Sequence, residues 1–251
     1  MKRICIITLL LLLLLVPLKS IIAQEKSGLK PEIGCDIVTS YIWRGSAIYS
    51  SIGEKNVLAP SFQPSFSASY RGFKIGTWGS IDFTGTYKEL DYYLSYSLKG
   101  FTVTYTDYYW ASDWIVDNYF DYKNNSTAHH LEVSLSYKNE KIPFSLLIAT
   151  MFYGADKKFE DTTQNNYSTY IEAGYSIPLN KFNIDLFLGV TPMDGLYGDG
   201  YGGKDGFAIV NAGVSASRAI EITEKFSVPV KASIIANPQA GRLFLVFGIT
   251  L

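Results

Sequence analysis

Apolar and polar residues alternate with a period of two along most of the chain. The stretch from Glu32 to Gly45 sets the pattern: one register is apolar and ends in Tyr41 and Trp43, while the other is mixed and charged. Successive side chains of a β-strand point to opposite faces. This stretch therefore predicts a strand between an apolar medium and a more polar space.

The same alternation returns after each turn signal. Arg71-Gly72 and Lys99-Gly100 are tight turns between alternating runs, which predicts hairpins. About twelve stretches of roughly ten residues follow, the length of a tilted strand that crosses a bilayer. The predicted strands are Ile33–Trp43, Leu58–Tyr70, Phe73–Phe83, Leu90–Leu98, Phe101–Tyr105, Leu131–Tyr137, Ile142–Phe152, Tyr167–Ile177, Phe182–Val190, Ala208–Ser217, Phe226–Ala236 and Leu243–Leu251.

Connection lengths alternate as well. Those after odd strands tend to be long and polar, and those after even strands are nearly all short, as in outer-membrane barrels with both termini in the periplasm. An open sheet edge in hydrocarbon would leave backbone groups unpaired. The pattern therefore predicts an all-β, transmembrane, antiparallel up-and-down β-barrel of about twelve strands. Leu243–Leu251 should close onto Ile33–Trp43, which faces lipid and places Arg44 at the outer mouth.

The first 23 residues have the pattern of a signal peptide. Lys2 and Arg3 precede an apolar run, Ile4–Val16, and a cleavage site is expected before Gln24. The chain is thus expected to be exported to a bacterial outer membrane, with residues 24–251 as the barrel domain and membrane lipid as a partner. Cys35 would be the one cysteine left, as a small hydrophobe on the apolar face.

Composition agrees with an exported barrel. Aromatic residues make up 15% of the chain and charged residues 18%. Removing Lys2, Arg3 and Lys19 with the leader leaves 19 basic and 23 acidic residues. That balance excludes nucleic acid as a partner.

Two loop motifs resemble binding sites by letter only. Gly198–Gly203 fits G-x-G-x-x-G, but a dinucleotide site needs a helix directly afterwards and a strand is predicted instead. Asp194, Asp199 and Asp205 lack the order of a calcium loop. No cofactor is expected.

The two histidines, His129 and His130, lack further metal ligands at suitable spacing and predict a surface or rim pair. A membrane hydrolase would need serine and histidine together. His129 falls on the lipid-facing register, opposite Ser134 and Ser136. We therefore predict no catalytic residue and no metal site.

The other register of the strands should line the interior. In Ala208–Ser217, the apolar residues Ala208 and Val210 are placed on the face opposite Asn211. The inward-facing candidates for a solute path are Asp36, Arg44, Lys74, Trp78, Asp82, Asp91, Tyr93, His130, Glu132, Tyr170, Glu172, Asp185 and Lys231.

These charges have two interpretations: they line a watery path, or they pair with one another and fill a plugged core. Barrels of about eight strands are filled and those of about 16 or more are open, so about twelve lies between. The many interior Ser and Gly residues favour a narrow pore for small hydrophilic solutes, with a structural or adhesion barrel as the alternative. Arg44 is either an ion-path residue or a partner of Asp82 or Asp91. One strand pattern serves monomers and trimers alike, so no oligomeric state is predicted.

The N-terminal part also resembles a known family. Thr39–Gly45, read T-S-Y-I-W-R-G, is followed by Pro60 and Gln63 and then by Gly76–Ser80, read G-T-W-G-S. This order is similar to the N-terminal signature of the TorF-type porin family, over about Cys35–Phe83. The chain departs from it at Ile81, usually Asn, and at Pro64, usually a small residue. The resemblance implies a bacterial outer-membrane barrel without a defined substrate.

Overall fold

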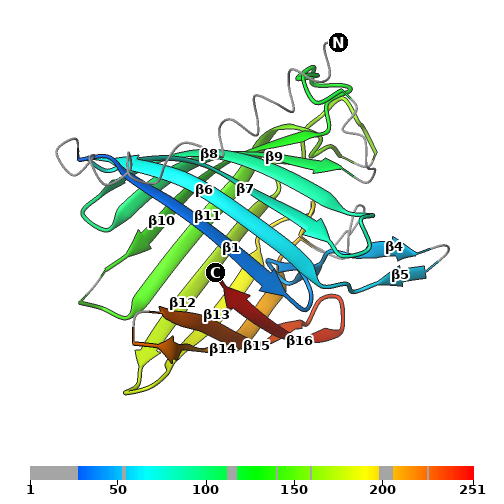
Figure 1. Ribbon diagram of the computed structural model, residues 1–251. Coiled ribbons are helices and arrows are strands. Elements are labelled where there is room, and N and C mark those ends of the chain that lie inside the picture. Colours follow the sequence, from blue (N-terminus) through cyan, green and yellow to red (C-terminus); the bar gives the residue numbers. More distant parts are fainter. Residues whose placement is uncertain are drawn as a thin grey trace, which may run out of the picture.

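The computed structural model describes residues 28–52, 55–111, 118–139, 141–158, 160–197, 206–224 and 226–251. Twelve strands form a closed antiparallel barrel in which each pairs with its neighbours in sequence and β1 also pairs with β16 (Figure 1). The predicted fold class and the predicted closure of the last strand onto the first are confirmed. No helix among these residues is long and apolar enough to cross a membrane. The proposed signal peptide lies outside the described residues.

Each wall strand overlaps one of the twelve predicted stretches. The wall strands are β1 (Lys30–Val38), β6 (Ser61–Tyr70), β7 (Phe73–Asp82), β8 (Lys88–Leu98), β9 (Phe101–Ala111), β10 (His129–Lys138), β11 (Phe144–Gly154), β12 (Thr169–Pro178), β13 (Asn183–Thr191), β14 (Ala208–Thr223), β15 (Phe226–Asn237) and β16 (Arg242–Thr250). Of these, β9 runs on to Ala111, well beyond the predicted Phe101–Tyr105. Two small hairpins lie between β1 and β6: β2 (Ile42–Trp43) with β3 (Ser46–Ala47), and β4 (Ser50–Ile52) with β5 (Lys55–Val57).

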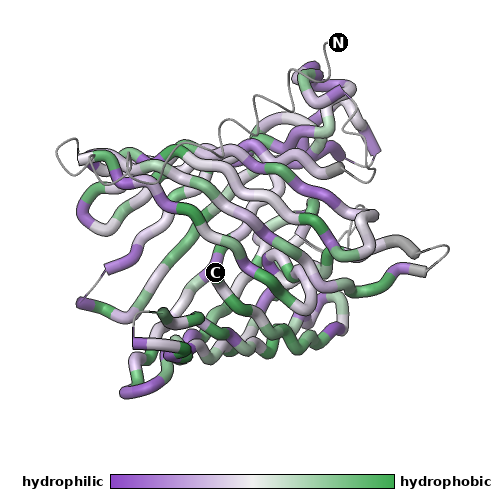
Figure 2. Tube along the Cα trace, viewed as in Figure 1, coloured by the Kyte–Doolittle hydropathy of each residue, from purple (hydrophilic) through white to green (hydrophobic). Residues whose placement is uncertain are grey.

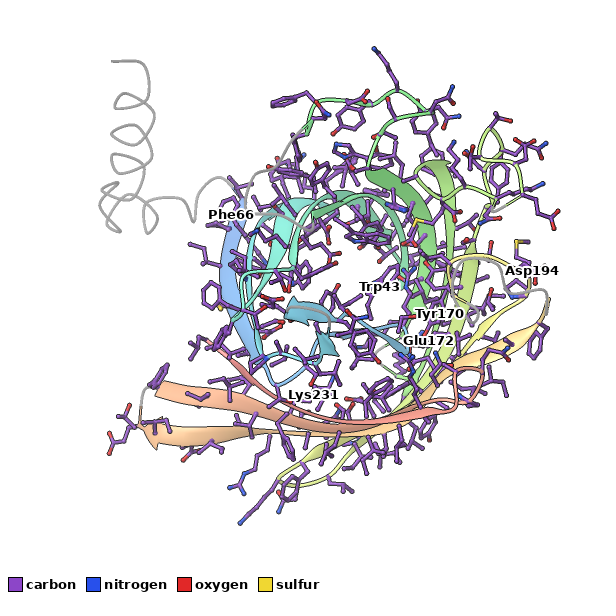
Figure 3. The ribbon with its side chains drawn as sticks, turned by 90° about the vertical axis from the view of Figure 1, so that its right-hand side faces the viewer. Trp43, Phe66, Tyr170, Glu172, Asp194 and Lys231 are labelled. Atoms are coloured by element: carbon purple, nitrogen blue, oxygen red, sulfur yellow. The ribbon has the colours of Figure 1, made fainter. Side chains whose placement is uncertain are left out.

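The period of two separates an apolar outer face from a polar inner face. Phe66 is 49% exposed and lies on the outside of the wall (Figure 3), whereas the inward-facing Ser67 is buried. Hydrophobic residues recur along the wall, most densely in β14 to β16, and hydrophilic residues gather in the connections (Figure 2). The wall therefore has the surface of a membrane barrel, in which apolar residues face out and polar residues face in.

Short turns and long connections lie at opposite ends of the barrel. Arg71-Gly72 and Lys99-Gly100 each have two positive φ angles, the signature of a type I′ turn, which matches the twist of paired strands. We call their end, where β1 begins and β16 finishes, the turn end. The opposite end, with the longer connections, is the loop end.

The predicted first strand is wrong in its last part. Pairing between β1 and β16 ends with Val38 opposite Gly248, and the Thr39 N–H donates to the Phe247 carbonyl at 2.9 Å. The chain then leaves the wall and turns into the barrel, so Tyr41 and Trp43 do not face lipid. On its other side, β1 pairs with β6 from Lys30 to Val38, so both ladders of β1 end at Val38.

The predicted facing of Ala208 and Val210 is also wrong. A β-bulge places Gly189 opposite Asn211 but Val190 opposite Ile209, so Val210 is an extra residue in β14. Ala208 and Val210 are buried in the barrel interior with Tyr170 and Tyr197, whereas Ile209 is 39% exposed. One inserted residue reverses the facing of every residue before it.

Candidate functional site: a hairpin inside the barrel

A β-hairpin occupies the barrel interior. It consists of β2, β3 and the turn Arg44-Gly45, and we call these residues, Ile42–Ala47, the plug hairpin. Both turn residues have positive φ, 52° and 80°, as in the type I′ turns of the wall. The Trp43 ring lies 5.6 Å from Tyr108, 5.7 Å from Trp110 and 5.5 Å from Tyr197, centroid to centroid, inside the wall (Figure 3).

Arg44 binds Glu132 of β10 through a two-pronged ion pair. Its Nη1 and Nη2 lie 2.5 and 2.9 Å from the two carboxylate oxygens, and the side chains are 11% and 2% exposed. Arg44 also donates a hydrogen bond to the Tyr197 hydroxyl and lies 5.0 Å from the Tyr170 ring centroid. The predicted place at the outer mouth and the predicted partners Asp82 and Asp91 are therefore wrong. Strand parity predicts that Arg44 faces the barrel interior, but it does not predict which side chain across the barrel binds it.

Gly45 touches the wall where no other residue fits. Its carbonyl accepts a hydrogen bond from Asn237 Nδ2 at 3.1 Å. A Cβ at Gly45 would lie 1.9 Å from the Val210 carbonyl oxygen, and its φ of 80° favours glycine. The plug hairpin therefore docks by backbone contact against the bulge in β14.

The base of the plug hairpin is also anchored. The Ile48 N–H donates to the Tyr41 carbonyl at 3.0 Å, which closes the hairpin. The Tyr41 ring packs 5.5 Å from Trp78 of β7. Beyond it, Arg242 donates to the Tyr49 hydroxyl at 2.5 Å. The plug hairpin thus contacts β9, β10, β12, β14 and β15, and its base contacts β7.

The loop that carries Tyr197 is fastened by a buried carboxylate. Asp156, in the connection between β11 and β12, accepts hydrogen bonds from the backbone N–H of Ser168 at 2.9 Å and from its hydroxyl at 2.7 Å. Burial raises the pKa of Asp156 above its ordinary value. The Ser168 hydroxyl oxygen in turn accepts from the Leu196 N–H at 2.8 Å, which positions Tyr197 beside Arg44.

Further carboxylates line the interior and accept hydrogen bonds from neutral groups. Glu172 accepts from the Tyr170 hydroxyl and, at 3.0 Å, from Asn211 Nδ2. Glu89 accepts from the Tyr87 hydroxyl at 2.7 Å and from Trp110 Nε1 at 2.8 Å. Asp91 is buried, and its Oδ1 has no hydrogen-bond partner among the described residues.

Arg44, Glu132, Tyr170 and Glu172 are thus brought together as one cluster, and Trp78 supports it through Tyr41. The other candidates lie apart from the cluster. Asp36 accepts from Thr250 at 2.6 Å, Lys74 pairs with Glu32 at 2.7 Å, Asp82 accepts from Thr84 at 2.8 Å, Asp185 accepts from Ser176 at 2.6 Å, Tyr93 lies against Gly76, and Lys231 is opposite Gly248.

Sequence reasoning missed several members of the interior, among them Glu89, Trp110 and Tyr197. Glu89 and Trp110 share the register of their inward-facing strand neighbours, so alternation carried far enough along β8 and β9 would have found them. Tyr197 lies in a connection without periodicity, where no pattern marks it. The interior keeps a cavity of about 240 Å³ beside the plug hairpin, lined by Asp36, Gln63 and Lys231 among others.

The histidines begin β10 at the loop end, as a rim pair would, but both are buried, which corrects the alternative of an exposed surface pair. His129 Nδ1 lies 2.6 Å from Asp107 Oδ1, and Nε2 lies 2.6 Å from the Tyr119 carbonyl oxygen. His130 packs 4.0 Å from the Trp110 ring. Both ring nitrogens of His129 are thus engaged, by a carboxylate and by a backbone carbonyl.

A metal site requires several ligating side chains close together. No group of three or more His, Cys, Asp or Glu residues suited to a metal ion occurs among the described residues. Gly198–Gly203, Asp199 and Asp205 lie outside the described residues.

No family model matches the chain, and no curated protein matches it. Among solved structures, the chain is similar to Salmonella typhi OmpF in complex with daunomycin. The match covers 90% of this chain and 98% of that one, at 11% sequence identity and a TM-score of 0.36. A function is therefore proposed from the barrel and its interior.

Proposed function

We propose that the protein is an outer-membrane channel for small hydrophilic solutes, narrowed by the plug hairpin. The observation that carries the proposal is a closed barrel, apolar outside and polar inside, whose interior holds a hairpin with an ion pair at its tip and a cavity beside it. A closed barrel pairs the backbone groups that hydrocarbon cannot satisfy. The cavity of about 240 Å³ beside the hairpin, lined in part by Asp36, Gln63 and Lys231, leaves room for water.

The two ends give the orientation. Short turns and both chain ends belong to the periplasmic side of such barrels, and longer loops to the outside. The turn end is then periplasmic and the loop end external, in a bacterial outer membrane. The resemblance of the N-terminal strands to the TorF-type porin family and the expected signal peptide support the same proposal.

The test is single-channel recording of the purified, folded protein in a planar bilayer. The proposal expects small, stable current steps in potassium chloride. A folded barrel that gives no steps would contradict it and favour a structural or adhesion barrel.

Membrane insertion has its own test. Val133 is 45% exposed in the middle of β10, so Val133→Arg should lower the free energy of unfolding from lipid vesicles by about 2–4 kcal/mol, the cost of arginine near the bilayer midplane. Asn125→Arg, in an external connection, is the control and should leave it unchanged. Equal stability of both variants would place Val133 outside hydrocarbon.

Cation preference is expected because Glu172 lies in the interior and accepts hydrogen bonds from the neutral side chains of Tyr170 and Asn211. Glu172→Gln should shift the reversal potential in a salt gradient toward lower cation selectivity. Asp121→Asn, which removes a carboxylate from an external connection, is the matched control. An unchanged reversal potential in Glu172→Gln would remove Glu172 from the ion path.

A further inference from the structure

A groove of about 670 Å³ crosses the outer surface of the barrel at the seam, over β14, β15, β16 and β1. Arg218, Val230, Ile249 and Ile37 form one cross-strand row along it. Ala216 and Ala232, paired with each other, lie in the next row. Their short side chains leave the hollow between the larger residues.

Arg218 is the cation of this groove. It is exposed, and its guanidinium lies 5.6 Å from the Phe182 ring centroid. Among the described residues it forms no ion pair with a carboxylate. An outward-facing arginine without a protein anion is complementary to an anion supplied by the membrane.

Strand geometry gives the depth of Arg218. Pairing of β14 with β13 ends with Ser217 opposite Asn183, and β14 continues to Thr223 without that neighbour. Ala208–Ser217 has the roughly ten residues that cross a bilayer. Arg218 therefore lies in the turn-end part of the wall, from which its long side chain can extend toward the lipid phosphates of that side.

The cross-strand row from Arg218 to Ile37 runs obliquely across the membrane-facing wall. Ile37 is next to the last residue of β1, which runs toward the loop end, so the row rises from Arg218 toward the other side. A lipid held by its headgroup at Arg218 would extend an acyl chain along the same path.

We infer that this groove binds one phospholipid of the inner leaflet, with an acyl chain along the row and its phosphate on Arg218. The inference rests on the proposed function, because the orientation of the barrel makes the turn end periplasmic. Lipopolysaccharide of the outer leaflet would place its phosphates at the opposite end of the row.

Native mass spectrometry of the folded protein in detergent, with added phosphatidylglycerol, phosphatidylethanolamine, diacylglycerol or lipid A, tests this. Wild type should retain one phospholipid, and Arg218→Gln should bind it about tenfold more weakly because a charge-assisted bond is lost. Ala232→Trp should fill the groove and retain none. Arg71→Gln and Ala173→Trp, at other places on the outer surface, should behave like wild type.

Unchanged phospholipid binding in Arg218→Gln, equal binding of diacylglycerol by wild type, or preferred binding of lipid A would each overturn the inference. Conductance of the same preparations keeps the two proposals apart. A normal channel that retains no phospholipid contradicts the groove alone, and a lipid-retaining barrel without current contradicts the pore alone.

Discussion

Arg44→Ala is expected to raise single-channel conductance several-fold. The substitution leaves Glu132, 2% exposed, without its cation. Breaking a buried ion pair on one side costs about 3–5 kcal/mol while the remaining charge stays buried. If the plug hairpin leaves the barrel interior, water reaches Glu132 and this cost is removed. The substitution therefore raises the population of the open arrangement.

Arg71→Ala is the control, because it removes an arginine from an exposed turn and should leave conductance at the wild-type value. Glu132→Gln should also raise conductance, since it weakens the same pair from the other partner. If conductance in Arg44→Ala equals that of wild type and the barrel is folded, the ion pair does not hold the pore narrow.

Gly45→Ala is expected to open the channel by a different route. The added methyl would meet the Val210 carbonyl oxygen at 1.9 Å, a distance at which the backbone of the hairpin or of β14 must move. The β14 strand is paired on both sides, whereas the hairpin is held by a few contacts. We expect the hairpin to yield, with higher conductance and a wall that stays folded.

Gly241→Ala separates this clash from the cost of positive φ. Gly241 has a φ of 62° but nothing within 4 Å of its would-be Cβ. Both variants carry the strain of a side chain in the left-handed region, about 1–2 kcal/mol, and only Gly45→Ala carries the clash. Equal conductance in the two variants would mean that Gly45 does not dock the hairpin.

The wall could be predicted from the sequence because its physics is local and repetitive. Side-chain alternation, turn dipeptides and connection lengths each depend on a few neighbouring residues, and together they require closure of β16 onto β1. The bulge at Val210 could not be predicted, because inserting one residue does not change how many apolar residues the strand contains. It does reverse the face on which Ala208 lies.

The plug hairpin was missed because aromatic residues serve two environments. Tyr41 and Trp43 continue the apolar register of β1, but their partners are Trp78, Tyr108 and Tyr197 rather than lipid. A signal for it was present: Arg44-Gly45 has the same basic-glycine form as Arg71-Gly72 and Lys99-Gly100. The ion pair to Glu132 could not be predicted, because it spans 88 residues and depends on how the barrel closes.

Excision of the plug hairpin tests the central claim most directly. Tyr41 and Ile48 are joined by a hydrogen bond of 3.0 Å, so Ile42–Ala47 can be replaced by Gly-Gly, a dipeptide suited to a tight hairpin turn. Single-channel recording of the folded variant should show conductance several-fold above wild type and no further increase on Glu132→Gln. Wild-type conductance in the folded variant would contradict the claim that this hairpin narrows the pore.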